Sequence, residues 1–426
     1  MFNKIFKLFL ELKTLYINNF DTSNMYNREE YGSAVEKWAD KVSFINPYFK
    51  NVLNNVQINQ YGYLCLFKYK SYNVLFNEMN PSELWTAYDG IYRDCRGVTI
   101  DVKNDVLVCN GFNKFFNVNE LEETSVDVIA EKIVNAKMVE VTDKLDGSLQ
   151  MARYYNNGVV LTGSTGLDPE ESYRVKNGTN FILNNYNYFS MLKENPNICF
   201  IFEYIMEDDP HVVMYDYSKI GGLHLLGWRD MNTGYLASYA ETFEMAEKFN
   251  VMTTSAENYT FDELLKVRDN FHCADKEGWV INIDGYRVKL KCTEFTELHG
   301  VISGVRFNSD RLGNTLLRAL QNDNIDDIMA GMTERYKNEA EKTLNTIRKY
   351  IDIHEGILDK YLEEGKDYMS TPLEFVIWAN KNIPAPWAAR TINKFKGTNN
   401  KWLRGQRFYQ IREFVENHEK ENNINA

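Results

Sequence analysis

The chain contains 426 residues, carries a formal net charge of −12 at pH 7 and has six cysteines. Its length suffices for two or three domains. The acidic balance argues against a protein that coats nucleic acid indiscriminately. The longest apolar stretches fall far below the ~20 residues of a bilayer-spanning helix. The cysteines form no Cys-x-x-Cys pair and mostly lie in apolar runs, so we expect reduced thiols in a cytoplasmic protein without a membrane partner.

The first 60 residues carry little chemical signal. Residues 1–13 mix apolar and charged side chains and lack a small-residue cleavage site, which predicts an amphipathic helix rather than a signal peptide. We therefore treat residues 1–60 as a partly helical N-terminal extension.

Strand patterns begin after this extension. They are predicted over Tyr61–Phe67, Gly97–Ile100 and Val106–Cys109. Two cations lie next to predicted strand ends, Arg96 before the second strand and Lys114 after the third. Taken alone, each is also compatible with an ordinary surface charge.

The next strand leads to the central motif of the sequence. Apolar and polar residues alternate over Val139–Thr142 and are followed by Lys-x-Asp-Gly at Lys144–Gly147. We expect Gly147 to adopt a backbone conformation closed to other residues, and the Lys144 amine to face a cavity. A lysine titrates near ~10.4 in model peptides, so neighbouring cations or a metal must lower this pKa before the amine can attack. A solvated lysine in a surface turn is the alternative.

A hairpin and a buried strand follow the motif. The strand after Lys144 continues to Tyr155, turns at Asn156–Gly158 and returns over Val159–Thr162. A helix is predicted over residues 180–193. The run Ile198–Tyr204 is almost continuously apolar except for Glu203. Because a buried carboxylate is costly without a partner, Glu203 is either a functional residue or half of a buried salt bridge.

A second hairpin places two lysines on one face. Strands are predicted over 222–228 and 235–239, helices over 240–249 and from a capping box at Thr260, and then a hairpin over Glu277–Ile283 and Tyr286–Lys291. Lys289 and Lys291 are two residues apart in a strand, so their side chains project together. The two ammonium groups repel each other unless an anion lies between them, and a phosphate is the obvious candidate.

The last third of the chain follows helical spacing, which predicts an all-helical region at 301–426. Within it, residues 387–412 contain seven cations, five aromatic residues and no acidic residue. This combination suits a phosphate backbone with stacked bases. A helical subdomain with a basic outer face is the alternative.

The ordered motifs resemble those of a known superfamily. Lys144–Gly147, Phe202–Tyr204, Glu277–Val280 and Lys289–Lys291 are similar to the motifs of covalent nucleotidyltransferases, which include ATP-dependent ligases and mRNA capping enzymes. Two upstream motifs, Cys95–Gly97 and Lys114–Asn117, resemble those of the bacteriophage RNA ligase 1 family, which includes tRNA-repair ligases. The resemblance covers residues 61–299.

The resemblance implies a fold and an activity. The fold would be α+β, with an ATP-grasp-like nucleotidyltransferase domain of antiparallel sheets and flanking helices at 61–300, then a helical, RNA-binding domain at 301–426. The activity would be ATP-dependent joining of RNA 5′-phosphate and 3′-hydroxyl ends through lysyl-AMP and RNA-adenylate. The implied setting is RNA or tRNA repair, with nicked tRNA as a substrate, an end-healing kinase/phosphatase as a partner, and the host cytoplasm as the location if a phage encodes the chain.

The resemblance also implies roles for individual residues. Lys144 would attack the α-phosphorus of ATP, and Glu277 would hold Mg²⁺. Arg96 and Lys114 would hold the triphosphate of the nucleotide, and Glu203 would hold its sugar. Lys289 and Lys291 would neutralise the α-phosphate. Phe116 and Gly147 would also belong to the nucleotide-binding site. Asp326 is the nearest equivalent of a metal-binding aspartate in the helical domain, and helix capping is its alternative role.

Two positions depart from the family pattern. Thr165 stands where a basic residue is usual, and Phe67 stands where a tyrosine is expected near the nucleotide. Trp228 could stack on adenine, with core packing as the alternative. Two other functions stay open: a GTP-dependent capping-like guanylyltransferase, and a non-enzymatic RNA-binding protein on a ligase fold. The complete set of charged motif residues argues against the second.

Overall fold

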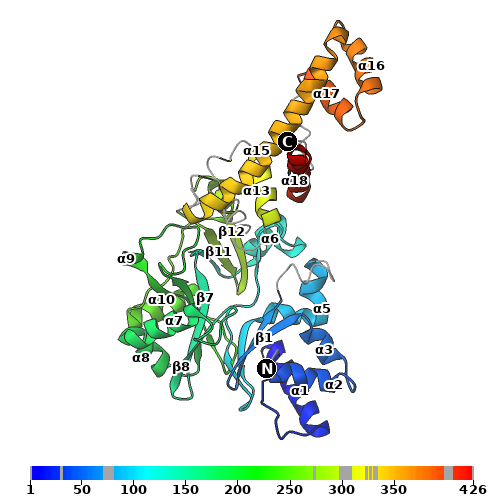
Figure 1. The fold of residues 1–426 in the computed structure, drawn as a ribbon. Coiled ribbons are helices and arrows are strands. Elements are labelled where there is room, and N and C mark those ends of the chain that lie inside the picture. The colour runs from blue at the N-terminus through cyan, green and yellow to red at the C-terminus, as the bar shows by residue number, and fades with distance from the viewer. Residues whose placement is uncertain are drawn as a thin grey trace. The chain divides into compact units, whose positions relative to one another are not determined.

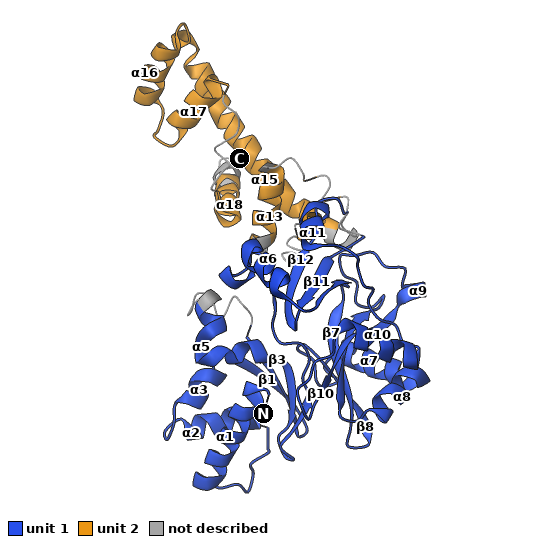
Figure 2. Ribbon diagram, turned by 180° about the vertical axis from the view of Figure 1, so that it is seen from behind, with its two compact units in different colours: residues 1–271, 275–292 blue, residues 272–274, 293–426 orange. Residues whose placement is uncertain are grey.

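The computed structural model describes residues 2–28, 32–70, 81–271, 275–296, 309–321, 325, 329, 334–397 and 406–424. The chain divides into two compact units (Figure 2), unit 1 with Met1–Phe271 and Asp275–Cys292, and unit 2 with His272–Ala274 and Thr293–Ala426. The functional boundaries at 60/61 and 300/301 stay predictions.

The first sheet of unit 1 is a meander covered by helices. Its strand order is β1-β2-β3-β4, with every pair antiparallel (Figure 1). Helix α1 buries Ile5, Leu8, Leu12 and Tyr16 in a core shared with this sheet, which confirms the predicted amphipathic helix. The elements are α1 (Lys4–Asn19), α2 (Ala34–Val42), α3 (Tyr48–Leu53), β1 (Val56–Tyr61), β2 (Leu64–Tyr69), α5 (Pro81–Asp94), β3 (Arg96–Asp101) and β4 (Val106–Cys109).

The prediction of one strand over Tyr61–Phe67 is wrong. The chain reverses at Gly62, whose φ of +58° lies in the left-handed region, so the segment is shared between β1 and β2. The predicted strands at residues 97–100 and 106–109 are confirmed as β3 and β4.

The second sheet has the order β10-β9-β7-β8. The predicted hairpin is confirmed, since Asn156 and Asn157 both have positive φ in the turn between β7 and β8. The predicted helix over 180–193 is two helices, because Asn185 is extended and its side chain caps the second by accepting the Asn187 N–H. The elements are β7 (Ser148–Tyr155), β8 (Gly158–Gly163), α7 (Tyr173–Asn184), α8 (Tyr186–Glu194), β9 (Ile198–Ile205), α9 (Tyr217–Ile220), β10 (Gly222–Asp230) and α10 (Tyr239–Phe249).

The predicted strand at 235–239 is reduced to a single bridge between Arg229 and Leu236. The helix predicted at 240–249 is confirmed as α10, and the capping box at Thr260 opens α11 (Phe261–Val267).

The third sheet carries most of the candidate site. Its order is β5-β12-β11-β6, antiparallel except that β5 runs parallel to β12. The predicted hairpin over residues 277–291 is confirmed as β11 and β12. The remaining elements of unit 1 are β5 (Phe116–Asn117), η1 (Glu122–Thr124), α6 (Val126–Asn135), β6 (Val139–Asp143), β11 (Gly278–Ile283) and β12 (Tyr286–Lys291).

All the elements described in unit 2 are helical, so the predicted α+β class with a helical C-terminal region is confirmed. The Thr371 side chain caps α16 by accepting the Glu374 N–H, and a small core forms around Phe375 and Ala379. The elements are α13 (Ser309–Gln321), α15 (Glu334–Glu364), η2 (Lys366–Tyr368), α16 (Pro372–Asn382), α17 (Trp387–Phe395) and α18 (Phe408–Ile424).

Two further expectations concern the whole chain. No helix among the described residues combines the length and apolar character needed to cross a bilayer. Five of the cysteines are buried free thiols, and Cys273 lies outside the described residues.

Candidate active site

The register of the third sheet brings three strand ends together. Strand β11 pairs with β6 so that Trp279 faces Asp143, and with β12 so that Gly278 faces Lys291. The Lys144 N–H continues this ladder by donating to the Gly278 carbonyl at 2.9 Å. Residues 144, 277 and 291 therefore lie together where these three strands begin or end. Gly278 has φ +143°, and a Cβ there would lie 2.1 Å from the Leu290 carbonyl oxygen, so a side chain at this position would clash.

The Glu277 carboxylate forms ion pairs with both lysines at these strand ends, Lys144 and Lys291. Lys144 Nζ lies 2.6 Å from Glu277 Oε2, and Lys291 Nζ lies 2.9 Å from Glu277 Oε1. The Glu277 side chain is 4% exposed and each lysine side chain 20%. A carboxylate this buried requires such partners. Lys144 is consequently an enclosed, ion-paired residue rather than a solvated lysine in a surface turn.

A cavity of about 340 Å³ opens beside this cluster, within the size range of small-molecule sites. Apolar side chains, including Phe115, Leu226 and Val280, share its wall with charged groups. The predicted site residues that line it are Arg96, Lys144, Gly147, Glu203, Glu277, Lys289 and Lys291.

Lys114 and Phe116 lie in a neighbouring cavity of about 680 Å³, which shares Phe112, Phe115 and Arg287 with the first. Lys114 Nζ lies 5.0 Å from the centroid of the Phe116 ring. Phe116 is 2% exposed, and its ring packs edge-on against Trp85 at 5.1 Å. Phe116 is thus mainly a packing residue beneath Lys114.

The pKa of Lys144 is shifted in the opposite direction to the one expected, whereas those of Lys289 and Lys114 are lowered. Burial acts to lower the pKa of Lys144, but the carboxylates of Glu277 and Glu203 outweigh it and raise that pKa. The expectation that neighbouring cations lower it is wrong for the chain by itself, because the charges of the neighbouring carboxylates dominate. Burial and the neighbouring cations, Lys114 first, instead hold the pKa of Lys289 well below its ordinary value. Burial also lowers the pKa of Lys114 to about 8.

Glu203 contacts the backbone of Gly147, three residues after Lys144. Glu203 Oε1 accepts the Gly147 N–H at 3.0 Å. Burial, together with the charges of Glu277 and Asp146 and against the opposing effect of Lys144, raises the pKa of Glu203 to about 7. The prediction of an unusual backbone conformation at Gly147 is wrong, since its φ is not in the left-handed region. The glycine is needed for space, because a Cβ would lie 2.5 Å from the Tyr204 carbonyl oxygen.

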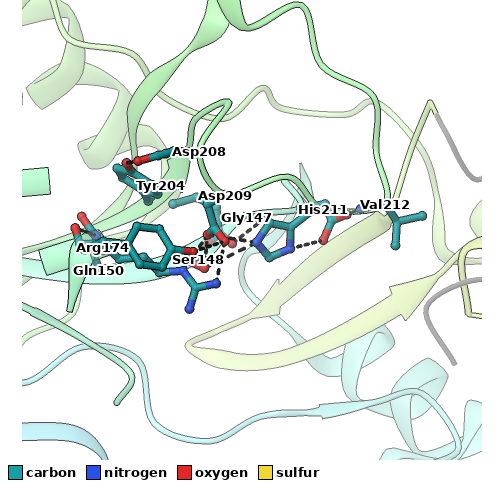
Figure 3. A network of polar contacts seen from close by, with 12 residues as sticks. Gly147, Ser148, Gln150, Arg174, Tyr204, Asp208, Asp209, His211 and Val212 are labelled. Carbon is teal, nitrogen blue, oxygen red and sulfur yellow. Dashed lines mark hydrogen bonds and ion pairs between the residues drawn. The ribbon is translucent and has the colours of Figure 1, made fainter. Parts of the chain in front are cut away.

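The sequence reading missed a polar network next to the motif (Figure 3). Asp146 and Ser148 contact a loop between β9 and β10 that contains Asp209 and His211. Asp209 also accepts from Arg174 at the start of α7. The loop has neither a periodic pattern nor a motif, so no sequence signal connected it to Lys144.

Three further positions singled out in the sequence, Thr165, Phe67 and Trp228, do not line the cavity. Thr165 presents its carbonyl to Asn59 at 2.7 Å. Phe67 is fully buried in the core of the first sheet. Trp228 packs against the core of the second sheet and beside Tyr235, which favours core packing over adenine stacking. Asp326 lies outside the described residues.

Several cations of the basic C-terminal tract have acidic partners. Lys394 Nζ lies 2.6 Å from Glu355 and 2.5 Å from Asp359 on α15. Arg412 pairs with Asp310 at 3.0 Å. Part of the tract therefore holds the helices of unit 2 together. Lys401 and Arg404 lie outside the described residues.

Comparison with known proteins places the site in a family context. Residues 94–295 match the family described as RNA ligase. This match confirms the predicted resemblance and the prediction of a ligase enzyme. No curated protein matches the sequence.

Solved structures show weaker similarity. A protein described as a candidate ATP-dependent DNA ligase from Aquifex aeolicus is 14% identical, with a TM-score of 0.43 over 72% of this chain and 81% of that one. The Naegleria gruberi RNA ligase is 18% identical over 44% of this chain and 57% of that one, with TM-scores of 0.35 for a mutant with ATP and Mn and 0.33 with PPi. At these values the neighbours carry no argument about function.

Proposed function

We propose that this chain, whose residues 94–295 match the RNA ligase family, is an ATP-dependent RNA ligase that joins 5′-phosphate and 3′-hydroxyl ends. The observation that carries the proposal is the enclosed amine of Lys144, 2.6 Å from Glu277, in a cavity that Arg96, Lys289 and Lys291 also line. Nucleotidyl transfer depends mainly on positioning and on neutralising phosphate charge. This set of groups is suited to both.

In the first step, Lys144 Nζ attacks the α-phosphorus of ATP. A phosphorus–nitrogen bond forms, the bond to the bridging oxygen of the β-phosphate breaks, and pyrophosphate leaves. The attacking amine must first lose a proton, and Glu277 Oε2 at 2.6 Å is the nearest acceptor. Lys289 and Lys291 neutralise the α-phosphate, while Arg96 and Lys114 hold the outer phosphates. Glu203 contacts the sugar, and Phe116 and Gly147 shape the nucleotide site.

The next two steps transfer the adenylate and seal the strand. An oxygen of an RNA 5′-phosphate attacks the phosphorus of lysyl-AMP, the phosphorus–nitrogen bond breaks, and the lysine recovers a proton. An RNA 3′-hydroxyl then attacks the activated 5′-phosphorus and displaces AMP, while its own proton is released. We propose nicked tRNA as the substrate in RNA repair, an end-healing kinase/phosphatase as a partner, and RNA contacts on unit 2.

A divalent metal would have few protein ligands here. Among the described residues, no three histidine, cysteine or acidic side chains gather into a metal site. Glu277 fits Mg²⁺ as a single carboxylate ligand, since Mg²⁺ commonly takes one or two carboxylates and completes its shell with phosphates and water. The ion would neutralise phosphate charge. Asp326 is proposed as a metal-binding residue of unit 2 on sequence grounds alone.

The test is transfer of label from ATP labelled at the α-phosphate, with Mg²⁺. We expect covalent label on the wild-type chain and on Lys219→Ala, an exposed control lysine, but none on Lys144→Ala. Ligation of nicked anticodon loops against linear single strands then identifies the RNA. Labelling by GTP instead of ATP would indicate a capping-like enzyme. RNA binding without any label would indicate a non-enzymatic protein.

A further inference from the structure

We infer that His211 is a positioning residue for Lys144, on which it acts by helping to hold the turn after the lysine, at Asp146 and Ser148, against the β9–β10 loop. The inference rests on the proposed function of Lys144. It assigns a role to a loop residue that makes no contact with Lys144 in the described structure and that no motif contains.

The first attachment is at Asp146, two residues after Lys144. Asp146 Oδ1 lies 3.4 Å from His211 Nδ1. Its other oxygen accepts the N–H groups of Val212 and Val213 at 2.8 and 3.0 Å, and its own N–H donates to the Tyr215 hydroxyl at 2.8 Å. Asp146 is therefore bound to four residues of one loop, which lie between positions 211 and 215.

The second attachment is at Ser148, where β7 begins. Its hydroxyl donates to Asp209 Oδ2 at 2.6 Å, and that oxygen lies 3.2 Å from His211 Nε2. Arg174 and Tyr173 of α7 also donate to Asp209, at 2.9 and 3.1 Å. Figure 3 shows the His211 ring between Asp209 and Val212, with Arg174 reaching Asp209.

The His211 ring suits this place only in its charged form. The Asp146 and Asp209 side chains are 6% and 1% exposed, and buried carboxylates need a paired cation. An imidazolium donates from both nitrogens at once, whereas a neutral imidazole donates from one. Burial opposes the charge, but hydrogen bonds to Asp146 and Asp209 raise the pKa of His211 to about 9.

The other ionisable groups around the ring have secondary effects on this balance. Glu203 on β9 interacts with His211 through its charge. Arg174 and Tyr173 approach from α7 and contact Asp209 rather than the ring. Tyr215 lies on the same loop and contacts the Asp146 backbone. The two aspartates therefore set the protonation of His211, and loss of its proton removes one of its two hydrogen bonds to them.

This role predicts a defect confined to the step that uses the lysine. A displaced turn carries Lys144 Nζ out of line with the α-phosphorus, and small misplacements of a reacting group slow chemistry strongly. Sealing of an RNA that is already adenylated at its 5′ end does not require the amine. That step should be largely insensitive to His211.

The experiment compares wild type, His211→Gln and the matched control Tyr173→Phe, which removes one donor to Asp209 and leaves His211 in place. Lysyl-AMP formation is measured between about pH 6 and 10, and sealing of pre-adenylated RNA at neutral pH. We expect His211→Gln to form lysyl-AMP about tenfold more slowly at neutral pH and to seal pre-adenylated RNA normally. The wild-type rate should fall above a pH of about 9, and this alkaline decline should be missing in the variant.

Amide hydrogen exchange gives a readout independent of activity. Residues 144–148 should exchange faster in His211→Gln than in wild type, and should be unchanged in Tyr173→Phe. The inference is overturned if His211→Gln forms lysyl-AMP and exchanges its amide hydrogens at the same rates as wild type. It is also overturned if the variant loses lysyl-AMP formation and sealing of pre-adenylated RNA to the same extent. A wild-type chain that takes no label contradicts the proposed function instead, and the exchange comparison still decides the attachment by His211.

Discussion

Asp143 and Lys276 form an ion pair of 2.5 Å between Oδ1 and Nζ, one residue before Lys144 and Glu277 respectively. Lys276 also reaches Glu257 at 3.0 Å, and its Nζ lies 5.1 Å from the centroid of the Trp279 ring. Two consecutive ion pairs thus connect the end of β6 to the segment that enters β11. The outer pair supports the inner one by fixing the register of these segments.

Replacing Lys276 by methionine should therefore loosen the site. The change leaves Asp143 and Glu257 without their shared cation, and their side chains are only 24% and 23% exposed. We expect the free energy of unfolding in urea to fall by about 1–3 kcal/mol, between the values for exposed and buried pairs. Lysyl-AMP formation should slow as well. Lys219→Met, which breaks an exposed pair, is the control, and equal effects of both changes would refute the supporting role of Lys276.

Glu277→Gln should lower the pKa of Lys144. Glu277 has the largest effect of the three carboxylates that raise this pKa, so its removal leaves the lowering effect of burial less opposed. We expect a lower apparent pKa, measured as the pH dependence of reductive methylation at Lys144 by mass spectrometry. Adenylation should nevertheless slow on the order of a hundredfold, because phosphate and proton contacts are lost. An unchanged methylation profile would contradict the pairing.

Glu203→Gln should stabilise the protein at neutral and higher pH. The pKa of Glu203 is raised from 4.5 to about 7 in the folded chain, so the folded state keeps a proton that the unfolded state releases. Its contribution is full below about pH 4.5 and is lost as the pH rises through about 7. We expect the difference in free energy of unfolding between Glu203→Gln and wild type to grow over this window, by at most about 3 kcal/mol. A difference independent of pH would refute the raised pKa.

Gly147→Ala should damage the site through crowding. The added Cβ would lie 2.5 Å from the Tyr204 carbonyl oxygen and 2.9 Å from Glu203 Cγ. We expect a loss of about 1–3 kcal/mol in the free energy of unfolding and slow adenylation. Gly158→Ala is the matched control, since its Cβ would meet nothing closer than 4.0 Å. Equal tolerance of both changes in thermal unfolding would contradict the close approach.

The sequence predicted the parts of the site that strand periodicity controls. Alternation around Val139–Thr142 and Lys289–Lys291 defines which side chains share a face, so Lys144, Glu277 and the paired lysines could be grouped before their distances were known. Phe67 shows the limit of such patterns, because an apolar strand residue can face the core or a cavity. The structure directs it into the core.

The contacts of irregular segments could not be predicted. Asp209 and His211 lie in a loop more than sixty residues after Asp146, and nothing in their local pattern indicates that they contact it. The direction of the pKa shift at Lys144 likewise depended on a distance, since Glu277 lies 2.6 Å from the amine and its charge raises the pKa. Composition and spacing contain no such distances.

Mass spectrometry of the chain after incubation with ATP and a divalent metal tests the central claim most directly. We expect one adenylate per chain, located by peptide mapping on Lys144, bound through an acid-labile phosphorus–nitrogen bond and removed by added pyrophosphate. An adenylate on another residue, or none on a folded chain, would contradict the account.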